Sequence, residues 1–280
     1  MKQPMVFTPV DMEKWERREI FRYFSQMAPT GYSVTVELDI TRLRQRLRER
    51  GLRFFPAYLW LVTRALNEQP EFRTAVQGEA VGWYNTLTPL YAVFHPQSKT
   101  FSLMWTEYDD DFDAFYRDFL RDEAAYGENK GLLAKPELPP PNAYTVSCVP
   151  WVAFRHFAVH SYGAAKPYYF PSVVAGKYYE REERLLPLSL TCHHAAADGW
   201  HVSRFLRRLQ RDMDEFQQIG RPEALAGGFR FLFRPFSTDM YYQKWIKQLK
   251  FDKSRLSLRE KNVIPRGMTV FSLTGSRDLL

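Results

Sequence analysis

Residues 186–201 read LPLSLTCHHAAADGWH, which predicts a strand that ends in two adjacent histidines and leads directly into a helix. Up to Cys192, leucine and cysteine alternate with proline, serine and threonine, which is the period of a strand with one buried face. Asp198 and Gly199 then open a helix, because aspartate is a favoured N-cap residue. A strand that feeds a helix in this way indicates an α/β protein.

The two histidines are candidates for acid–base chemistry, because a neutral imidazole with a reference pKa of about 6.5 suits a general base. Adjacent strand residues point to opposite faces, so only one of His193 and His194 can face a given pocket. The small residues Ala195–Ala197 leave room for a substrate. A structural interpretation stays open, in which Asp198 only caps a helix, His193 is a hydrogen-bonded core residue and the alanines only pack.

The spacing of these residues does not suggest a metal site or a serine-hydrolase triad. Adjacent histidines diverge, and His201 on the helix supplies no usual ligand spacing. The chain also contains no Gly-x-Ser-x-Gly nucleophile elbow. We therefore expect no metal.

The remaining elements follow from hydrophobic periodicity and turn residues. The strands expected are Ser33–Ile40, the hairpin arms Leu90–His95 and Thr100–Trp105, Tyr144–Cys148, Trp151–Phe157 and Leu186–Cys192. The helices expected are a short basic one capped by Thr41, a buried one over Ala57–Asn67, and others over Asp109–Tyr126 and about Trp200–Phe216. Because strands and helices alternate without a strict βαβ rhythm, we predict an α/β two-layer sandwich, a mixed β-sheet covered by helices.

The domain organisation follows from composition and charge. Residues 221–280 carry 12 basic against 5 acidic side chains, so they hold the whole net charge of +7, and residues 1–220 hold 27 of each sign. We expect a catalytic domain over 1–220 and a basic carboxy-terminal extension over 221–280. A neutral body is a poor binder of phosphate backbones, so no nucleic acid partner is expected. The extension, with its interleaved aromatic residues, leaves binding to nucleic acid or an anionic membrane open.

No run of the chain approaches the roughly 18 apolar residues that cross a bilayer. The amino-terminal residues MKQPMVFTPVDMEKWERRE hold no apolar stretch of the signal-peptide type. Two cysteines, Cys148 and Cys192, are too few for a disulfide framework. We expect a soluble, cytoplasmic protein without a membrane span.

His193-His194-x-x-x-Asp198-Gly199 resembles the signature of the coenzyme A-dependent acyltransferase superfamily. Further blocks resemble the chloramphenicol acetyltransferases of the classical trimeric type, in that family's order and with nearly its spacing, from about Phe7 to Phe216. They are Trp15-Glu-Arg-Arg-Glu followed by Phe21, Val36–Thr41, Arg53–Ala57, Pro70–Arg73, Val93–His95, Tyr126–Asn129, Val146-Ser-x-x-Pro-Trp-Val152 and Gly176–Tyr179.

The resemblance implies transfer of acetyl from acetyl-CoA, as cosubstrate, to the 3-hydroxyl of chloramphenicol, with no acyl-enzyme. His194 would be the general base, and the Ser147 hydroxyl would stabilise the tetrahedral oxyanion, a contribution of about 3 kcal/mol. Asp198 resembles a buried aspartate paired with Arg17, which holds the histidine loop. The resemblance also implies a homotrimer with active sites at subunit interfaces.

Two sets of side chains match the substrate-binding positions of the family. Trp151, Lys177, Tyr178 and Arg53 would bind the coenzyme A moiety, and Arg53 stands where a lysine is common, a change that keeps the charge and alters the geometry. The acceptor pocket would be lined by Phe24, Thr30, Tyr32 and Phe170.

This chain departs from the family at several of these positions. Thr30 and Tyr32 replace the usual cysteine and phenylalanine, which makes the pocket more polar, and Val174 replaces a threonine that helps to hold a water molecule. Three other functions stay open. They are the same chemistry on another hydroxylated acceptor, a dihydrolipoamide acyltransferase core, for which no lipoyl domain precedes the motif, and a catalytically silent trimeric binding protein.

Overall fold

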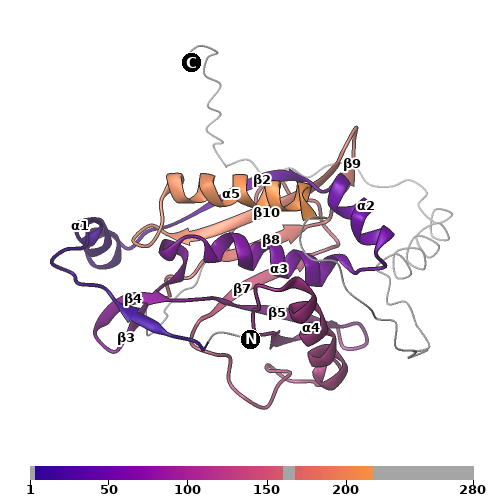
Figure 1. Ribbon diagram of the computed structural model, residues 1–280, viewed down its shortest axis with the longest axis horizontal. Helices are drawn as coiled ribbons and strands as arrows, with labels where there is room; N and C mark the ends of the chain where they lie inside the picture. Colours follow the sequence, from indigo (N-terminus) through magenta and orange to yellow (C-terminus); the bar gives the residue numbers. More distant parts are fainter. Residues whose placement is uncertain (1–3, 160–167, 217–280) are drawn as a thin grey trace, which may run out of the picture. The chain divides into compact units, whose positions relative to one another are not determined.

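The computed structural model describes residues 4–159 and 168–216, which form a mixed sheet with helices across one face (Figure 1). The sheet has seven strands in the described residues, in the order β2-β10-β8-β7-β5-β6, with β9 paired to β10. Strand β7 runs parallel to both β5 and β8, and the other pairs are antiparallel. The strand bounds are β2 Gly31–Asp39, β5 Thr88–His95, β6 Thr100–Trp105, β7 Ala143–Val149, β8 Ser172–Gly176, β9 Tyr179–Glu180 and β10 Arg184–His193. The predicted two-layer α/β fold is confirmed.

A small second sheet and short helical turns surround the amino-terminal segment. The small sheet has the order β1-β4-β3, with β1 at Phe7–Pro9, β3 at Thr74–Gln77 and β4 at Ala80–Tyr84. The short turns are α1 Arg18–Arg22, the π-helical turn η1 Tyr23–Met27 and the 3₁₀ turn η2 Pro70–Arg73.

Four longer helices cover the apolar face of the large sheet. They are α2 Thr41–Glu49, α3 Phe54–Asn67, α4 Phe112–Tyr126 and α5 Gly199–Asp214. As the sequence predicts, α3 is buried nearly all round, because it packs against α4, α5 and strand β5. Leu38, Leu188 and Val173 of the sheet share one core cluster with Trp60 of α3 and Phe205 of α5. This core holds the end of β10 and the start of α5, where the histidine motif lies.

The opposite face of the sheet is rich in hydroxyl groups. Register pairs Thr35 with Ser189, Ser189 with Val174 and Val174 with Ser147, so these four side chains point to the same face. The Thr35 hydroxyl donates to Ser189 Oγ over 3.2 Å. The polar alternation that predicts strand β2 therefore corresponds to a face that the helices do not cover.

Two local predictions are wrong. Residues Trp151–Phe157 form no strand, because their polar groups bond to loop backbone and to side chains: Lys177 N donates to Val152 O, and Phe157 O accepts from the Ser189 hydroxyl. A β-carbon on Gly176 would lie 2.9 Å from the Phe154 ring, so this segment packs closely on β8. Thr41 does not cap α2. Asp39 Oδ1 accepts from Thr41 N instead, and the Thr41 hydroxyl accepts from Arg184 N.

None of the helices within residues 4–159 and 168–216 is long and apolar enough to cross a membrane. The same residues hold no group of three or more His, Cys, Asp or Glu side chains placed to bind a metal ion. The predicted domain boundary at residue 220 and the basic extension over 221–280 lie outside the described residues.

Candidate active site

The histidine motif lies where β10 ends beside β2. His193 is the last residue of β10 and pairs with Gly31, and His194 N donates to Thr30 O over 2.8 Å. The chain then turns sharply, with Ala196 N donating to His193 O over 3.0 Å. Ala195–Ala197 are buried, because a tight turn against the body of the protein accepts only small side chains there. The three alanines therefore pack against the body of the protein, and the ring of His194 is the group of the motif that remains for chemistry.

Aromatic rings hold the imidazole of His194 in place. It stacks on Phe24 of η1, with centroids 4.0 Å apart and planes inclined by 16°. The ring of Tyr32 meets the imidazole edge-on at 5.2 Å. Among the described residues, the buried Nδ1 atom of His194 has no hydrogen-bond partner. Packing, and not a carboxylate on Nδ1, thus orients this ring, and Nε2 is the nitrogen that can reach a substrate.

Three of the four predicted acceptor-site residues gather around His194, namely Phe24, Thr30 and Tyr32. The Thr30 hydroxyl donates to Ala28 O over 2.7 Å, and the Tyr32 hydroxyl donates to Ala197 O over 3.2 Å. Burial, followed by the nearby Cys192 and Asp198, raises the pKa of Tyr32, so this hydroxyl stays protonated. Both hydroxyls bond to the backbone, so the rings and methyl groups remain for contact with a ligand.

Phe170, the fourth of these residues, lies elsewhere. It is buried in the main core, with ring contacts to Tyr84 at 6.2 Å and Tyr168 at 5.4 Å. Its neighbour Tyr169 packs on His193 at 4.8 Å. No ring contact joins Phe170 to His194 in the part of the chain that the structure describes.

The side chain of His193 supports the turn that follows β10. Its Nδ1 accepts from Ala195 N over 3.2 Å, which fixes the start of the turn. Burial, with the charge of His194 as the second cause, lowers the pKa of His193, so its neutral form is favoured. The two adjacent histidines therefore diverge as predicted: one packs against Tyr169 and the other stacks on Phe24.

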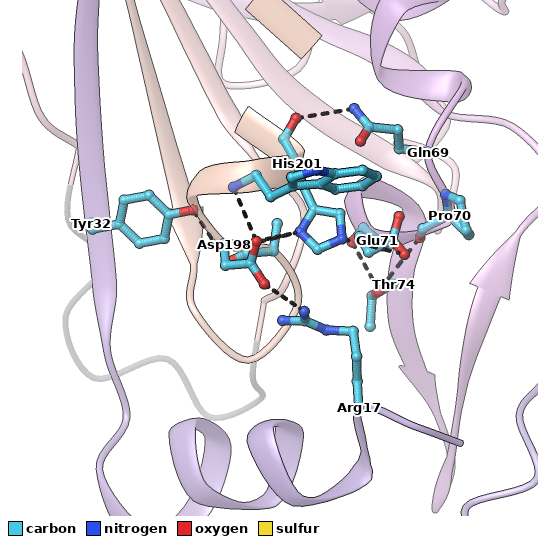
Figure 2. Close-up of polar contacts among 10 residues, drawn as sticks. Arg17, Tyr32, Gln69, Pro70, Glu71, Thr74, Asp198 and His201 are labelled. Carbon is cyan, nitrogen blue, oxygen red and sulfur yellow. Dashed lines mark hydrogen bonds and ion pairs between the residues drawn. The ribbon is translucent and has the colours of Figure 1, made fainter. Parts of the chain in front are cut away.

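Asp198 joins the histidine loop to the amino-terminal segment (Figure 2). One oxygen, Oδ2, accepts from Arg17 Nη1 over 2.7 Å, and the other caps α5 by accepting from Trp200 N over 3.1 Å. Burial raises the pKa of the Asp198 carboxyl, but the hydrogen bond from Arg17 and the charge of His201 outweigh it, so the net pKa is lowered. The helix cap and the ion pair, which the sequence offers as alternatives, are both present.

His201, on the first turn of α5, extends this network. Its Nδ1 lies 2.8 Å from Asp198 Oδ1, and its Nε2 lies 3.5 Å from Glu71 Oε1 of η2 (Figure 2). Burial raises the pKa of Glu71, but the hydrogen bond from His201 and the charges of His201 and Arg17 outweigh burial. The net pKa of Glu71 therefore lies below its ordinary value.

The residues predicted to bind coenzyme A lie around the start of α3 and the segment after β8. Arg53 precedes α3 and forms a bidentate ion pair with Glu123 over 2.5 and 2.7 Å. Tyr178 is stacked under Arg44, whose guanidinium lies 4.7 Å above its ring and donates to its hydroxyl over 3.2 Å. Lys177 is half-buried beside Tyr178, and its backbone N–H donates to Val152 O.

Trp151 is the most exposed of the predicted donor-site side chains. Its ring is 62% exposed and meets Phe94 edge-on at 4.9 Å. An aromatic surface of this kind is open to a flat or apolar part of a ligand.

Ser147 and His194 of the same folded subunit do not lie beside each other. By register Ser147 is level with Ser189, four residues before His193 and two strands away from β10. At about 3.3 Å per residue and about 4.8 Å per strand, the Cα atoms of Ser147 and His194 are on the order of 19 Å apart. One chain therefore does not bring the Ser147 hydroxyl to the His194 imidazole.

The profile of the chloramphenicol acetyltransferase family matches residues 5–210, which is more than half of the chain. The chain belongs to the chloramphenicol acetyltransferase family. Two curated members illustrate the similarity. A chloramphenicol acetyltransferase from Klebsiella sp is 39% identical over 213 residues, which are 75% of this chain and 95% of that protein. One from Campylobacter coli is 39% identical over 208 residues, which are 74% of this chain and 98% of that protein.

One solved structure agrees with the assignment to the chloramphenicol acetyltransferase family, and a second shows the same fold. A structure described as chloramphenicol acetyltransferase superposes with a TM-score of 0.65 at 27% identity, covering 74% of this chain and 100% of that one. A dihydrolipoamide acetyltransferase from Azotobacter vinelandii has a TM-score of 0.53 at 20% identity, covering 68% of this chain and 84% of that one. At that identity the similarity shows the fold alone.

Sequence reasoning on this chloramphenicol acetyltransferase family member missed four side chains at the predicted sites. Glu123 and Arg44 bond to Arg53 and Tyr178 across long separations in the chain, and no local pattern marks them. The sequence marks His201 only as a residue without metal-ligand spacing, and Glu71 only as part of the Pro70–Arg73 block. The spacing of Asp198 and His201 was a usable signal, since an N-cap residue followed by a polar side chain three positions later is typical of a capping box.

Proposed function

We propose that this protein transfers the acetyl group of acetyl-CoA to the 3-hydroxyl group of chloramphenicol and so inactivates the antibiotic. The observation that carries the proposal is the His194 imidazole, held between Phe24 and Tyr32 at the end of β10 with Nδ1 buried. The match to the family over residues 5–210, at 39% identity to curated members, supports this choice of reaction.

His194 acts as the general base. Nε2 of the neutral imidazole accepts the proton of the acceptor hydroxyl while its oxygen attacks the thioester carbonyl. The tetrahedral oxyanion accepts a hydrogen bond from Ser147, and collapse of this intermediate breaks the carbon–sulfur bond. The departing thiolate takes this proton from the imidazolium. The products are an acetyl ester and free coenzyme A, and His194 is neutral again. No acyl group is bonded to the enzyme.

The separation of Ser147 from His194 supports a site made by two copies of the chain. The segment around Phe157 covers Ser189 on this face of the sheet, but Ser147 is only half-buried, so a neighbouring subunit can approach its hydroxyl. His194 of one subunit and Ser147 of the next then act on the same carbonyl, in a cyclic homotrimer. With this arrangement a single subunit holds no complete site and should be inactive alone.

Acetyl-CoA is bound near the start of α3 and the end of β8. Lys177 and Arg53 offer positive charge for its phosphate groups, and the rings of Tyr178 and Trp151 offer apolar surface. The Glu123 carboxylate neutralises much of the charge on Arg53 through its bidentate contact. We therefore assign Arg53 a smaller share of phosphate binding than its sequence position suggests.

The acceptor pocket favours an aromatic ligand. Although Thr30 and Tyr32 add two hydroxyls to it, both donate their protons to backbone carbonyls and offer a ligand only acceptor lone pairs. Phe24 and Tyr32 present ring surface beside His194. A flat nitrophenyl group with a nearby hydroxyl fits this lining.

The test is release of coenzyme A thiol from acetyl-CoA by the purified full-length protein, with and without chloramphenicol. The proposal expects thiol release only with chloramphenicol, together with a stoichiometric 3-acetyl ester in the product mixture. Thiol release with other hydroxylated aromatic compounds but not with chloramphenicol would show that the proposed acceptor is wrong and that the proposed acetyl transfer is right. Binding of chloramphenicol without thiol release would favour a silent binding protein.

A further inference from the structure

We infer that Arg44, and not Arg53, is the arginine that contributes most to binding the phosphate groups of acetyl-CoA. The inference rests on the proposed site for acetyl-CoA and adds a residue that no local sequence pattern marks. Arg44 lies on α2, whereas Arg53 directly precedes α3. The start of α2 is tied to the start of β10, where Arg184 N donates to the Thr41 hydroxyl over 2.8 Å (Figure 1).

The guanidinium of Arg44 lies between the two segments that carry the predicted donor-site cations. It lies 4.7 Å above the ring of Tyr178, which directly follows Lys177. It also lies 5.9 Å from the ring of Phe54, which directly follows Arg53. Its Nη2 donates to the Tyr178 hydroxyl over 3.2 Å. Two rings and a hydroxyl therefore hold this cation inside the proposed site.

Arg44 keeps hydrogen-bonding capacity that the described residues do not use. Stacking on a ring engages the face of a guanidinium, so the N–H groups in its plane stay available for a phosphate. Nε of Arg44 is buried without a partner among the described residues, and Nη1 bonds to none of them. None of the described carboxylates forms an ion pair with Arg44, whose contacts are the two rings and the hydroxyl. Such a cation attracts an anionic group of a ligand.

Burial strengthens this attraction. Arg44 is half-buried, so solvent screens its charge less than it screens the charge of an exposed side chain. The contacts with Tyr178 and Phe54 also hold the guanidinium in one place before a ligand arrives. A cation that is already ordered loses little conformational entropy on binding, which favours affinity.

The situation of Arg53 is the opposite. Both of its terminal nitrogens donate to Glu123 of α4, over 2.5 and 2.7 Å. A phosphate group that binds Arg53 must displace the Glu123 carboxylate or lie close to it, and two anions at such a distance repel each other. The charge of Arg53 is therefore largely used within the subunit, whereas no described carboxylate neutralises Arg44.

The experiment compares the full-length parent with Arg44→Gln, Arg44→Lys and the double variant that combines Arg53→Gln with Glu123→Gln. The double variant removes both charges of the pair, so it leaves no unpaired carboxylate in the site. The matched control is Arg48→Gln, at an exposed position of the same helix. Calorimetry measures the Kd for coenzyme A and for 3′-dephospho-coenzyme A. Thiol release measures kcat/KM with acetyl-CoA and with acetyl-pantetheine, which carries no phosphate.

We expect Arg44→Gln to raise the Kd for coenzyme A about tenfold or more, the usual effect of losing a hydrogen bond between charged groups. Arg44→Lys should raise it about threefold, because lysine keeps the charge and loses the planar fork. The double variant should raise it by no more than about threefold. Arg48→Gln should match the parent. A loss that disappears with 3′-dephospho-coenzyme A assigns Arg44 to the 3′-phosphate, and a loss that persists assigns it to the diphosphate.

The choice of donor separates phosphate binding from a structural role. In Arg44→Gln, kcat/KM should fall with acetyl-CoA by about the factor by which Kd rises, and much less with acetyl-pantetheine. Equal losses with both donors would overturn the inference, because they would show that Arg44 only supports the ring of Tyr178. Melting temperatures identify a variant that fails to fold, and Arg44→Lys then carries the same comparison.

Three further outcomes would overturn the inference. They are an unchanged Kd for coenzyme A in Arg44→Gln, a larger rise in Kd in the double variant than in Arg44→Gln, and a parent that binds no coenzyme A. Failure of the proposed function is a separate result. If coenzyme A binds with a Kd that depends on Arg44, but no thiol is released with chloramphenicol, the proposed acceptor is wrong and the assignment of Arg44 is right.

Discussion

The imidazole of His194 lies nearly flat on the ring of Phe24, with centroids 4.0 Å apart and planes inclined by 16°. Phe24 belongs to the turn after α1, and His194 follows the last residue of β10, so two distant segments meet in this contact. In a Ser-His-Asp triad a carboxylate on Nδ1 orients the histidine. Here the described residues place no partner on the buried Nδ1, so ring packing does that work.

Replacing the stacked ring should loosen the base without removing it. Aromatic pairs of this kind contribute about 0.5–1.5 kcal/mol beyond burial, so we expect Phe24→Ala to lower kcat by about 2- to 12-fold. Phe24→Tyr keeps the ring and serves as the control. Steady-state kinetics of both variants test this, and an unchanged kcat in Phe24→Ala would show that another contact orients His194.

Removal of the base should stop the reaction and leave the fold intact. His194→Ala should lower kcat by about 10²- to 10⁴-fold, the range typical of general-base catalysis. The melting temperature and the Kd for acetyl-CoA should stay close to those of the parent, because His194 holds no side-chain hydrogen bond in the described structure. Turnover within tenfold of the parent would contradict the role of His194.

Ser147→Ala should lower kcat by roughly 10²-fold or more with little change in melting temperature, because the hydroxyl acts on the oxyanion. The hydroxyl-rich sheet face suggests a sharper test of its position. If each site combines His194 of one subunit with Ser147 of the next, a refolded equimolar mixture of His194→Ala and Ser147→Ala should regain activity. In random trimers three quarters are hybrids with one complete site in three, so about a quarter of the parental sites should return.

The control for that mixture is each variant refolded alone, which should stay inactive. No recovery from a mixture that forms hybrid trimers would place both residues in the same subunit. The register of β7, β8 and β10 argues against that outcome.

The Arg17–Asp198 pair should support stability as well as activity. The two side chains are 14% and 32% exposed, so we expect Asp198→Asn and Arg17→Ala each to cost about 1–3 kcal/mol, between the values for exposed and buried pairs. Both variants should also lose activity, since the histidine loop shifts. Urea unfolding at pH 7 measures the cost. A large loss of stability in Ser147→Ala but none in Asp198→Asn would reverse the assigned roles.

The same pair predicts a pH dependence of stability. The pKa of Asp198 in the folded protein lies below its ordinary value of 3.8, so its contribution is fully present above that value and is lost as the pH falls through the lowered pKa. The free energy of unfolding of the parent should therefore fall more steeply below about pH 4 than that of Asp198→Asn. The gap between the two proteins should narrow on acidification, and a constant gap from pH 5 to pH 2.5 would contradict the assignment.

Removal of residues 221–280 should leave acetyl transfer within about twofold of the full-length protein, because the family match ends at residue 210. Retention of both proteins on an anionic surface across a salt series tests whether the basic extension binds a partner. A folded, trimeric but inactive truncation would show that the extension completes the site.

The strand–histidine–helix order of residues 186–201 is predictable from the sequence, since alternation of apolar residues and an aspartate N-cap are local signals. The ordered motifs of the sequence also predict the family whose profile matches residues 5–210. The local pattern is misleading at Trp151–Phe157, where an apolar run resembles a strand but its polar groups bond to loop backbone and to side chains.

The contacts between distant side chains follow from the tertiary structure and not from any local pattern. Phe24 on His194, Glu71 on His201 and Glu123 on Arg53 are contacts between residues 70 or more positions apart. The separation of Ser147 from His194 likewise follows from strand order, which depends on pairing across the sheet. Local sequence patterns report the period of each element, whereas the position of one element against another depends on packing summed over the whole core.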